Sequence, residues 1–235
     1  FHTRASYNDE TGKMVEQLKS TGVKSIAVVY QDDAFGKAGL KSAQGAFERQ
    51  GVKPAIEAPI DMNKLDALVS TVAKVAQTQP GAIIMVTAGK ASTAFIREYL
   101  KTGERPQFFG VSVLSAKALF ADLGADAHGI VIAQVVPSPL RASYPISKEF
   151  IVAAKKANSK DTTYNSLEGY ITAKVFIEAV RRAGKDLSRE KLISALETMN
   201  NYDLGGFVVD YSGGKRFGST FVDLSIISKS GQFLH

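Results

Sequence analysis

The stretch IAVVYQDDAFGKAGL, from Ile26 to Leu40, contains the pattern that organises the first half of the chain. Residues 24–30 are mostly apolar and β-branched, which is typical of a buried strand. Residues 35–50 then follow a helical pattern, which Gly51 ends. Asp32 and Asp33 stand between the two elements, where a carboxylate can cap a helix and interact favourably with its dipole. A capping role is therefore favoured over a metal site for this acidic pair.

The same alternation of strand and helix extends outward from this stretch. A helix is expected before it, over residues 8–20. After it we expect strands at 53–60, 82–86, 107–113 and 130–136, separated by helices at 65–77, 93–102 and 117–123. Two prolines in residues 53–60 place that strand near a sheet edge. Strands separated by helices pair in parallel, and right-handed crossovers then give an α/β fold with a doubly wound sheet.

The alternation breaks at PSPLRASYP, residues 137–145, because three prolines in nine residues cannot continue the interior of a sheet. Beyond this break, helices are expected at 147–156, 167–183 and 188–199. The end of the chain has only short apolar segments between glycine turns. Since these helices have little sheet of their own to cover, the sequence predicts a second domain of which a part is missing.

The segment AIIMVTAGKASTAFIREYL, from Ala82 to Leu100, superficially resembles a phosphate-binding loop. Such a loop needs a glycine five residues before its Gly-Lys pair and a Ser or Thr directly after the pair. Ile84 and Ala91 occupy these two positions, so the motif is absent. What remains is a buried strand followed by a loop of small residues. Ligands bind at the carboxyl ends of strands in open α/β sheets, so the loop is a candidate ligand contact.

Composition argues against several classes of partner and chemistry. The 235 residues carry a formal net charge of +6, but Lys and Arg are spread along the chain beside acidic residues. No nucleic-acid partner is therefore predicted. No apolar run is long enough to span a bilayer, so direct insertion into a membrane is not expected. The lack of cysteine excludes thiol catalysis and thiolate metal sites.

Catalytic signatures are not found either. The histidines at positions 2, 128 and 235 are too scattered to suggest a metal motif or a catalytic triad. Neither a G-x-S-x-G elbow nor a G-x-G-x-x-G fingerprint occurs. No metal, no cofactor and no enzymatic activity are therefore predicted. An α/β enzyme with an unrecognised site is the remotest alternative.

Four segments carry a resemblance that covers the whole chain. They are FHTRASYNDE from Phe1, IAVVYQDDAFGKAGL from Ile26, GIVIAQVVPSP from Gly129 and LEGYITAKVFIEAVRRAG from Leu167. In this order they resemble the periplasmic substrate-binding proteins of ABC importers, of the leucine/isoleucine/valine-binding type. The resemblance implies the type I periplasmic-binding fold, with doubly wound parallel sheets in two lobes joined by a three-stranded hinge.

The resemblance also implies how the chain divides. Residues 7–134 and 219–235 would form the second lobe, with a last strand near 219–233. Residues 139–217 would be the remaining part of the first lobe, most of which is expected to be missing. Crossovers between the lobes are expected near residues 2–6, 135–140 and 218–220.

The function implied by the resemblance is that of a periplasmic, extracytoplasmic binding protein. Such a protein captures a small amino acid or other carboxylate in an interlobe cleft by hinge closure. Its expected partners are this small-molecule ligand and the membrane permease of an ABC importer. The ligand-binding ectodomain of a sensory receptor, which can have the same fold, is the closest alternative.

Ligand contacts are implied in the loops after the second-lobe strands and on the long helix of the first lobe. The expected residues are Asp33, Phe35, Ala88, Gly89, Lys90, Ser112, Glu168 and Tyr170. Phe35 and Tyr170 would form apolar walls against the ligand, and core packing is the alternative for each. The small residues Ala88 and Gly89 would let a ligand approach the backbone.

Two positions depart from the pattern of the branched-chain amino acid binders. Those proteins place a carboxylate after the strand that corresponds to residues 107–113, where it holds the ligand's ammonium, but Ser112 is neutral. Lys90 stands where an aromatic residue is common, and it is either a solvated loop lysine or a ligand contact. Because a buried unpaired ammonium is costly, either the ligand is a carboxylate without an amine, paired by Lys90, or another carboxylate holds the ammonium. The alternatives for that carboxylate are Asp32, Asp33 and Glu168.

Overall fold

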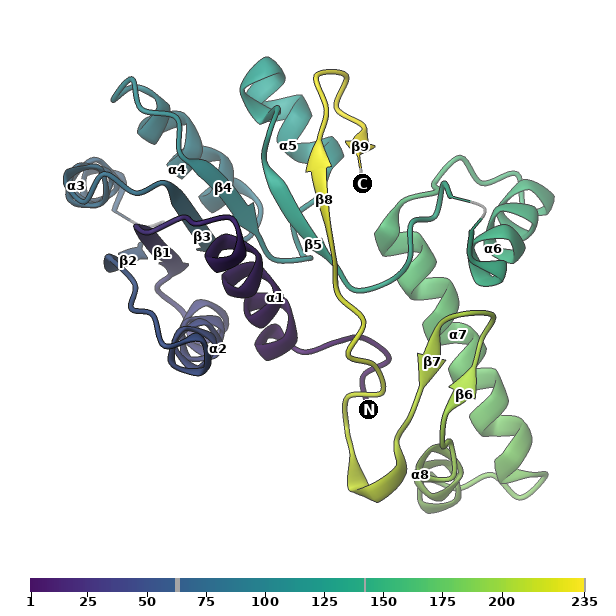
Figure 1. The fold of residues 1–235 in the computed structure, drawn as a ribbon. Helices are drawn as coiled ribbons and strands as arrows, with labels where there is room; N and C mark the ends of the chain where they lie inside the picture. The colour runs from purple at the N-terminus through teal and green to yellow at the C-terminus, as the bar shows by residue number, and fades with distance from the viewer. Residues whose placement is uncertain (62–63, 142, 235) are drawn as a thin grey trace. The chain divides into compact units, whose positions relative to one another are not determined.

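The computed structural model describes residues 1–61, 64–141 and 143–234, with only the backbone of Leu65 and Asp66. The expected lobes also include positions 62, 63, 142 and 235, which lie outside the described residues. Contacts within the chain define two compact units (Figure 1). The larger unit consists of residues 7–134 and 224–235, and the smaller unit of residues 1–6 and 135–223.

The larger unit is built on a sheet whose strands alternate with helices along the chain. Its strands are β1 (Ile26–Gln31), β2 (Ile56–Ile60), β3 (Ala82–Val86), β4 (Gln107–Gly110), β5 (Val131–Gln134), β8 (Asp223–Ile227) and β9 (Phe233–Leu234). Its helices are α1 (Tyr7–Ser20), α2 (Ala34–Gln50), α3 (Leu65–Gln77), α4 (Lys90–Leu100), α5 (Ala116–Leu123) and the 3₁₀ turn η1 (Gly124–Ala127). The strand order is β2-β1-β3-β4-β5-β8-β9, and β1 to β5 pair in parallel.

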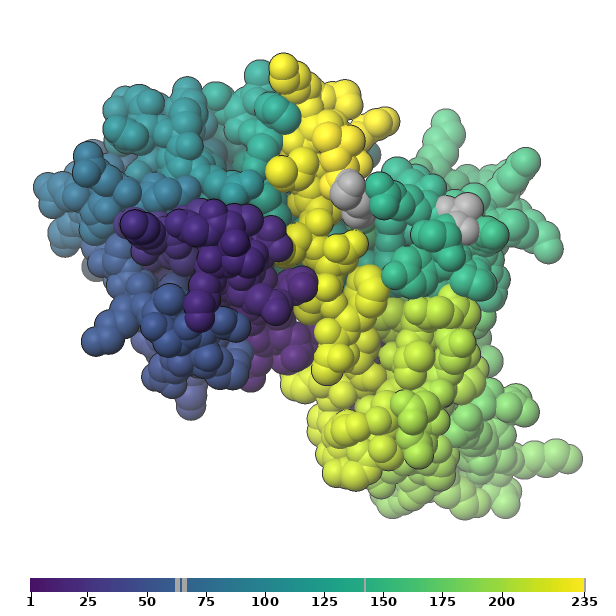
Figure 2. Space-filling model, viewed as in Figure 1, coloured from purple at the N-terminus to yellow at the C-terminus, as the bar shows by residue number. Residues whose placement is uncertain are grey.

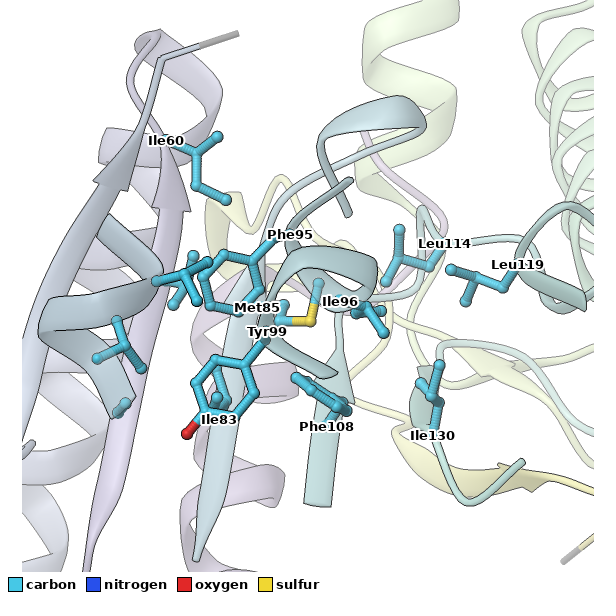
Figure 3. Close-up of a cluster of buried hydrophobic side chains, with 14 of the residues drawn as sticks. Ile60, Ile83, Met85, Phe95, Ile96, Tyr99, Phe108, Leu114, Leu119 and Ile130 are labelled. Atoms are coloured by element: carbon cyan, nitrogen blue, oxygen red, sulfur yellow. The ribbon is translucent and has the colours of Figure 1, made fainter. Parts of the chain in front are cut away.

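Helices cover both faces of this sheet. Successive residues of a strand point to opposite faces, so a buried parallel strand is apolar throughout. Val29, Ile83 and Met85 belong to a buried cluster that includes residues of α3, α4 and α5, among them Phe95 (Figure 3). α1 and α2 cover the other face, where both contact β3. The expected doubly wound arrangement is therefore confirmed for this unit.

Helices α1 and α2 pack against each other, as the purple and blue atoms of Figure 2 show. α1 buries Met14, Val15 and Leu18, which lie on one side of the helix because of their spacing. α2 ends at Gly51, whose φ of 65° lies in the left-handed region that glycine adopts without a Cβ clash. The glycine signal in the sequence thus ends the helix where it was expected to end.

Most elements expected in the first half are confirmed, with shifts at some ends. The helix at 65–77 and the strand at 82–86 have the expected bounds, and β2 lies at the expected sheet edge. α4 begins at Lys90 rather than near residue 93, since the turn at Gly89 (φ 51°, ψ −128°) leads directly into the helix. β4 ends at Gly110, so the remaining residues of the expected strand 107–113 belong to a loop.

The expectation for the end of the chain is wrong. In place of one last strand near residues 219–233, β8 and β9 form an antiparallel hairpin. Gly231 in its turn has a φ of 77°, which glycine adopts readily. A Cβ on Gly231 would lie 2.5 Å from the ring of Phe120 in α5, so the turn packs closely on that helix.

The smaller unit is mainly helical. Its elements are α6 (Pro145–Lys156), α7 (Tyr164–Ala183), α8 (Arg189–Glu197), the short hairpin strands β6 (Tyr202–Asp203) and β7 (Val208–Val209), and the 3₁₀ turn η2 (Ser212–Gly214). The expected helices are confirmed, and Ser188 caps α8 as predicted. The first residues of the chain belong to this unit, because the Tyr211 hydroxyl and the Gly218 N–H both donate to the His2 carbonyl, at 3.0 and 2.8 Å.

A cluster of charged side chains on α7 reaches the end of α8 through Arg182. Glu178 accepts hydrogen bonds of 2.7 to 2.9 Å from Arg181 and Arg182. Arg182 also donates to the carbonyl and hydroxyl oxygens of Thr198, at 3.2 Å, and its guanidinium lies 5.3 Å from the ring centroid of Tyr202. The bonds from Arg181 and Arg182 lower the pKa of Glu178 from 4.5 to about 2.

Close packing of α2 on the sheet gives a first prediction. A Cβ on Gly39 would lie 2.2 Å from Cγ1 of Val86, a fully buried residue of β3. We expect Gly39→Ala to lower the free energy of unfolding by about 1–3 kcal/mol, the usual cost of overpacking. Gly45→Ala on the same helix is the control, since its Cβ would meet only Arg49 Nη1, at 3.4 Å. It should raise stability by about 0.5–1 kcal/mol. Equal effects of the two changes in urea denaturation would contradict this packing.

Glu178 gives a prediction about pH. Its folded pKa lies below the ordinary value, so its stabilisation is present above about pH 4.5 and is lost as the pH falls through about 2. Because Arg181 is exposed to screening by solvent, we expect Glu178→Gln to cost only about 1 kcal/mol at pH 7. The difference in the free energy of unfolding between this variant and the parent protein should narrow as the pH falls from 4.5 to 2. Urea denaturation, followed at the amide signals of α7, measures this difference. Asp186→Asn, at a side chain that is 95% exposed, should show neither effect.

Candidate ligand-binding edge

The strand order creates a point of divergence between β1 and β3. From β1 the chain continues through α2 to β2, and from β3 through α4 to β4, on opposite sides of the β1–β3 pair. α2 and α4 also cover opposite faces of the sheet. Such a divergence at the carboxyl ends of strands is where ligands bind in open α/β sheets. Most of the expected contact residues lie at this edge, in the loops after β1, β3 and β4: Asp33, Phe35, Ala88, Gly89, Lys90 and Ser112.

Asp33 caps α2, as the sequence suggested. Its Oδ1 accepts from the Gly36 N–H at 2.8 Å, and its Oδ2 accepts from Gln31 Nε2 at 2.6 Å. The neighbouring Asp32 pairs instead with Lys37 at 2.8 Å, and this bond raises the pKa of the Lys37 ammonium. Both acidic side chains therefore have partners within the larger unit, and Asp33 caps the helix with one oxygen while the other accepts from the last residue of β1.

Gln31 connects the two diverging loops, and sequence reasoning missed it. Its amide donates to Asp33 after β1, and its Oε1 accepts from the Ala88 N–H after β3, at 3.4 Å. The only signal available in the sequence was a polar residue at the end of an apolar strand. Because the amide bonds to both sides of the divergence, it helps to fix the distance between the loops.

Phe35 lies in the first turn of α2, and its ring is half-buried. It makes an edge-to-face contact with Tyr7 of α1, with centroids 5.6 Å apart and planes at 70°. This contact holds the orientation of the ring. A cleft role and a packing role are both compatible with a ring that is partly exposed.

The loop after β3 combines an ordered base with an exposed cation. The hydroxyls of Thr87 and Ser92, both fully buried, lie 2.7 Å apart and form a hydrogen bond between the two ends of the loop. Gly89 and Lys90 are exposed above it. Among the described side chains, none is an ion-pair partner of the Lys90 ammonium. The loop therefore presents a positive charge next to accessible backbone.

Ser112 has an unexpected partner in α1. Its backbone N–H donates to Oε2 of Glu10 at 2.7 Å, and its hydroxyl donates to Oε1 at 2.9 Å. Glu10 is fully buried and Ser112 is 8% exposed. The signal in the sequence is the position of Glu10, one turn before Met14 on the apolar side of α1. A buried carboxyl group thus stands behind Ser112.

Glu168 and Tyr170 belong to the smaller unit, on α7. Glu168 pairs with Arg4 at 3.3 Å. The Tyr170 hydroxyl donates to Glu149 Oε1 at 2.7 Å, and its ring packs on Phe150 with centroids 5.5 Å apart. Burial, followed by the bond to Glu149, raises the pKa of Tyr170 to about 12. Because these two residues belong to the smaller unit, their ligand role stays a prediction.

The two described surface grooves of the larger unit lie at the opposite edge of its sheet. One, of about 380 Å³, is lined by Arg105, Phe108 and His128 among others, and the other, of about 360 Å³, by Lys19, Lys24 and neighbours. Both lie beside the starts of strands, away from the candidate residues. Within residues 1–61, 64–141 and 143–234, no group of three or more His, Cys, Asp or Glu side chains could hold a metal ion.

Comparisons with known proteins agree over nearly the whole chain. Residues 1–221 match the family described as periplasmic binding protein. A substrate-binding periplasmic protein from Ralstonia solanacearum is 31% identical, with a TM-score of 0.87. An extracellular ligand-binding receptor from Verminephrobacter eiseniae is 27% identical, with a TM-score of 0.88. Each of these alignments covers 100% of this chain and 67% of the other.

A third solved structure, a possible leucine/isoleucine/valine-binding protein from Rhodopirellula baltica, is 30% identical, with a TM-score of 0.88. That alignment covers 99% of this chain and 65% of the other. The chain thus spans about two thirds of the length of the structures that it matches. A search of curated proteins gave no match.

The cap at Asp33 can be tested by substitution. We expect Asp33→Ala to lower the free energy of unfolding by about 1 kcal/mol, because the Gly36 N–H loses its acceptor. Asp33→Asn keeps an oxygen at this position and should cost less. Asp32→Ala removes only an exposed ion pair and should change stability by less than about 0.5 kcal/mol. Equal losses for the two alanine variants in thermal denaturation would show that the cap is not what stabilises this loop.

Proposed function

This chain belongs to the periplasmic binding protein family and has its type I fold, and from that premise we propose that it is the solute-binding component of an ABC importer. The family and its solved relatives are extracytoplasmic binding proteins. A periplasmic location and a membrane permease as partner are parts of the proposal. The observation that carries it is the likeness over the whole chain to a substrate-binding periplasmic protein. Among the described residues, no helix has the length and apolar character needed to cross a membrane.

The proposed ligand is a small amino acid or another small carboxylate. The name of the Rhodopirellula protein supports the amino acid class. At the candidate edge, Phe35 offers an apolar surface, Lys90 a positive charge, and Ala88 and Gly89 accessible backbone. These groups match a ligand with an apolar body and an anionic end. Capture by closure, with contributions from Glu168 and Tyr170, is the part of the proposal that rests on the resemblance alone.

We propose binding without chemical conversion of the ligand. The solved relatives are binding proteins by name. At the candidate edge, the carboxylates of Asp33 and Glu10 are engaged as a helix cap and as a partner of Ser112. Both roles are structural. Neither of them places a carboxylate where it could transfer a proton to a substrate atom.

A sensory ectodomain is the second candidate function. The Verminephrobacter relative is described as an extracellular ligand-binding receptor, which supports this alternative. The two candidates predict different partners. Reconstitution with a permease and its ATPase should give ATP-driven uptake of the ligand for an importer component, whereas a receptor ectodomain should give none.

The ligand class can be tested on the complete natural protein. A thermal-shift screen of aliphatic and aromatic acids, amino acids, sugars and polyamines should give its largest stabilisation with a compound that has a carboxylate and an apolar body. Mass spectrometry after incubation should recover this compound unchanged. We expect Phe35→Ala to weaken its binding by about 1–3 kcal/mol, or roughly fivefold to 150-fold.

Phe176→Ala is the matched control, because that ring is 53% exposed on α7 and is not a candidate contact. It should leave the affinity unchanged. A sugar or a polyamine as the best ligand would refute the ligand class. A converted product that disappears on mutation of an edge residue would refute binding without catalysis.

A further inference from the structure

Gln31 is the last residue of β1, where the chain segments that leave β1 and β3 diverge. The paired register of these two strands ends at Tyr30 and Val86. One residue further along, the Gln31 side chain reaches across to the loop after β3, and its Oε1 accepts from the Ala88 N–H at 3.4 Å. The side chain therefore continues the connection between the strands into the loops that carry candidate ligand contacts.

The turn after β1 holds the backbone of Gln31. The Asp33 N–H donates to the Gln31 carbonyl at 2.8 Å. A Cβ on Gly36 would lie 1.9 Å from the same carbonyl oxygen, so the first turn of α2 packs directly on this peptide group. Since the backbone is held in this way, the direction of the Gln31 amide depends mainly on the partners of its own two polar ends.

Asp33 sets the direction of the Gln31 amide. Gln31 Nε2 donates to Asp33 Oδ2 at 2.6 Å. An ionised carboxylate can only accept, so it faces the NH₂ end of the amide and leaves the amide oxygen on the other side. That oxygen then meets the Ala88 N–H. Because the second oxygen of Asp33 accepts from the Gly36 N–H at 2.8 Å, one carboxylate both caps α2 and orients Gln31.

The bond to Ala88 restrains the loop that carries Lys90. Ala88 directly precedes Gly89 and Lys90, which are both exposed. A loop that is already held loses less freedom when a ligand binds, so more of the interaction energy is available for affinity. At 3.4 Å the bond is long, and we therefore expect its loss to weaken binding moderately rather than to abolish it.

We propose that Gln31 is a positioning residue, which holds the loop of Ala88, Gly89 and Lys90 in the arrangement that receives the ligand, and that Asp33 sets the direction in which it acts. The inference rests on the proposed function, because it takes this loop as a ligand contact. Gln31 acts through the loop and not on the ligand. The same two bonds connect the start of α2 to the loop that leads into α4, so they also fix the spacing between two groups of candidate contacts.

Substitution by a residue of similar length tests this role in the complete natural protein. We would titrate L-leucine, L-phenylalanine, 4-methylpentanoate and 3-phenylpropanoate by calorimetry. The tightest of these probes should bind Gln31→Met about threefold to tenfold more weakly than the parent protein. The Ala88 amide should also exchange with solvent about fivefold faster, as measured by NMR. Gln44→Met is the matched control, because Gln44 donates to Glu57 at 2.9 Å elsewhere on α2, and it should change neither quantity.

A double-mutant cycle tests the direction of the amide. Asp33→Asn keeps an oxygen for the Gly36 N–H, but its new NH₂ faces Gln31, which must then turn its own NH₂ toward the Ala88 N–H and lose that bond. Gln31→Glu keeps an acceptor for Ala88 but sets two carboxylates against each other. Each of these single variants should bind about as weakly as Gln31→Met.

The combined variant should recover what each single change loses. The carboxylate of Gln31→Glu can accept both from the amide of Asp33→Asn and from the Ala88 N–H, which reverses donor and acceptor in the first bond and keeps the second. We expect its affinity and its Ala88 exchange rate to return to within about twofold of the parent values. Independent structural losses would instead add.

The outcomes distinguish this inference from the function on which it rests. Unchanged affinity in the folded Gln31→Met variant, an equal loss in Gln44→Met, or additive losses in the combined variant would each overturn the role of Gln31 and leave the solute-binding function standing. Should Gln31→Met fail to fold, the cycle of Asp33→Asn and Gln31→Glu decides in its place. Flat titrations of all four probes with the parent protein would count against the proposed ligand class and against this inference together.

Discussion

A parallel sheet that is buried on both faces must be covered by helices on both faces, and the rest of the larger unit follows from this constraint. α1 and α2 cover one face, and α3, α4 and α5 cover the other. The chain must therefore change faces, and the helices that follow the neighbouring strands β1 and β3, which are α2 and α4, lie on opposite faces. The diverging loops at that point leave an edge where backbone and polar side chains are accessible without disturbing the core. The candidate ligand site is a consequence of how the sheet is covered.

Polar groups at this edge are organised before any ligand arrives. Asp33 is held by the start of α2, Gln31 bonds to the loops on both sides of the divergence, and Thr87 pairs with Ser92 at the loop after β3. Side chains that are fixed in advance lose little freedom on binding, so more of the interaction energy is available for affinity. Lys90 differs from them, because it is exposed and no described side chain forms an ion pair with it.

The smaller unit obtains its order from a different source. Among its described residues, β-pairing consists of the short β6–β7 hairpin and a bridge between His2 and Phe217. Charge-assisted bonds compensate in part, since Glu178 connects two arginines and one of these arginines reaches the end of α8. Tyr170 is likewise held by Glu149 and by the ring of Phe150.

The sequence by itself determined the order and type of most elements, the edge position of β2, the cap at Asp33 and the end of α2 at Gly51. These depend on interactions between residues close together in the chain, such as side-chain period, prolines and glycine conformation. Only the tertiary structure decided that the last segment forms a hairpin on Phe120, that Gln31 joins two loops and that Ser112 stands against Glu10. Glu10 and Ser112 are 102 positions apart, and no local pattern specifies which buried carboxylate meets which loop. The pairing is decided when α1 packs on the sheet, because the polar groups that are buried there must then be hydrogen-bonded.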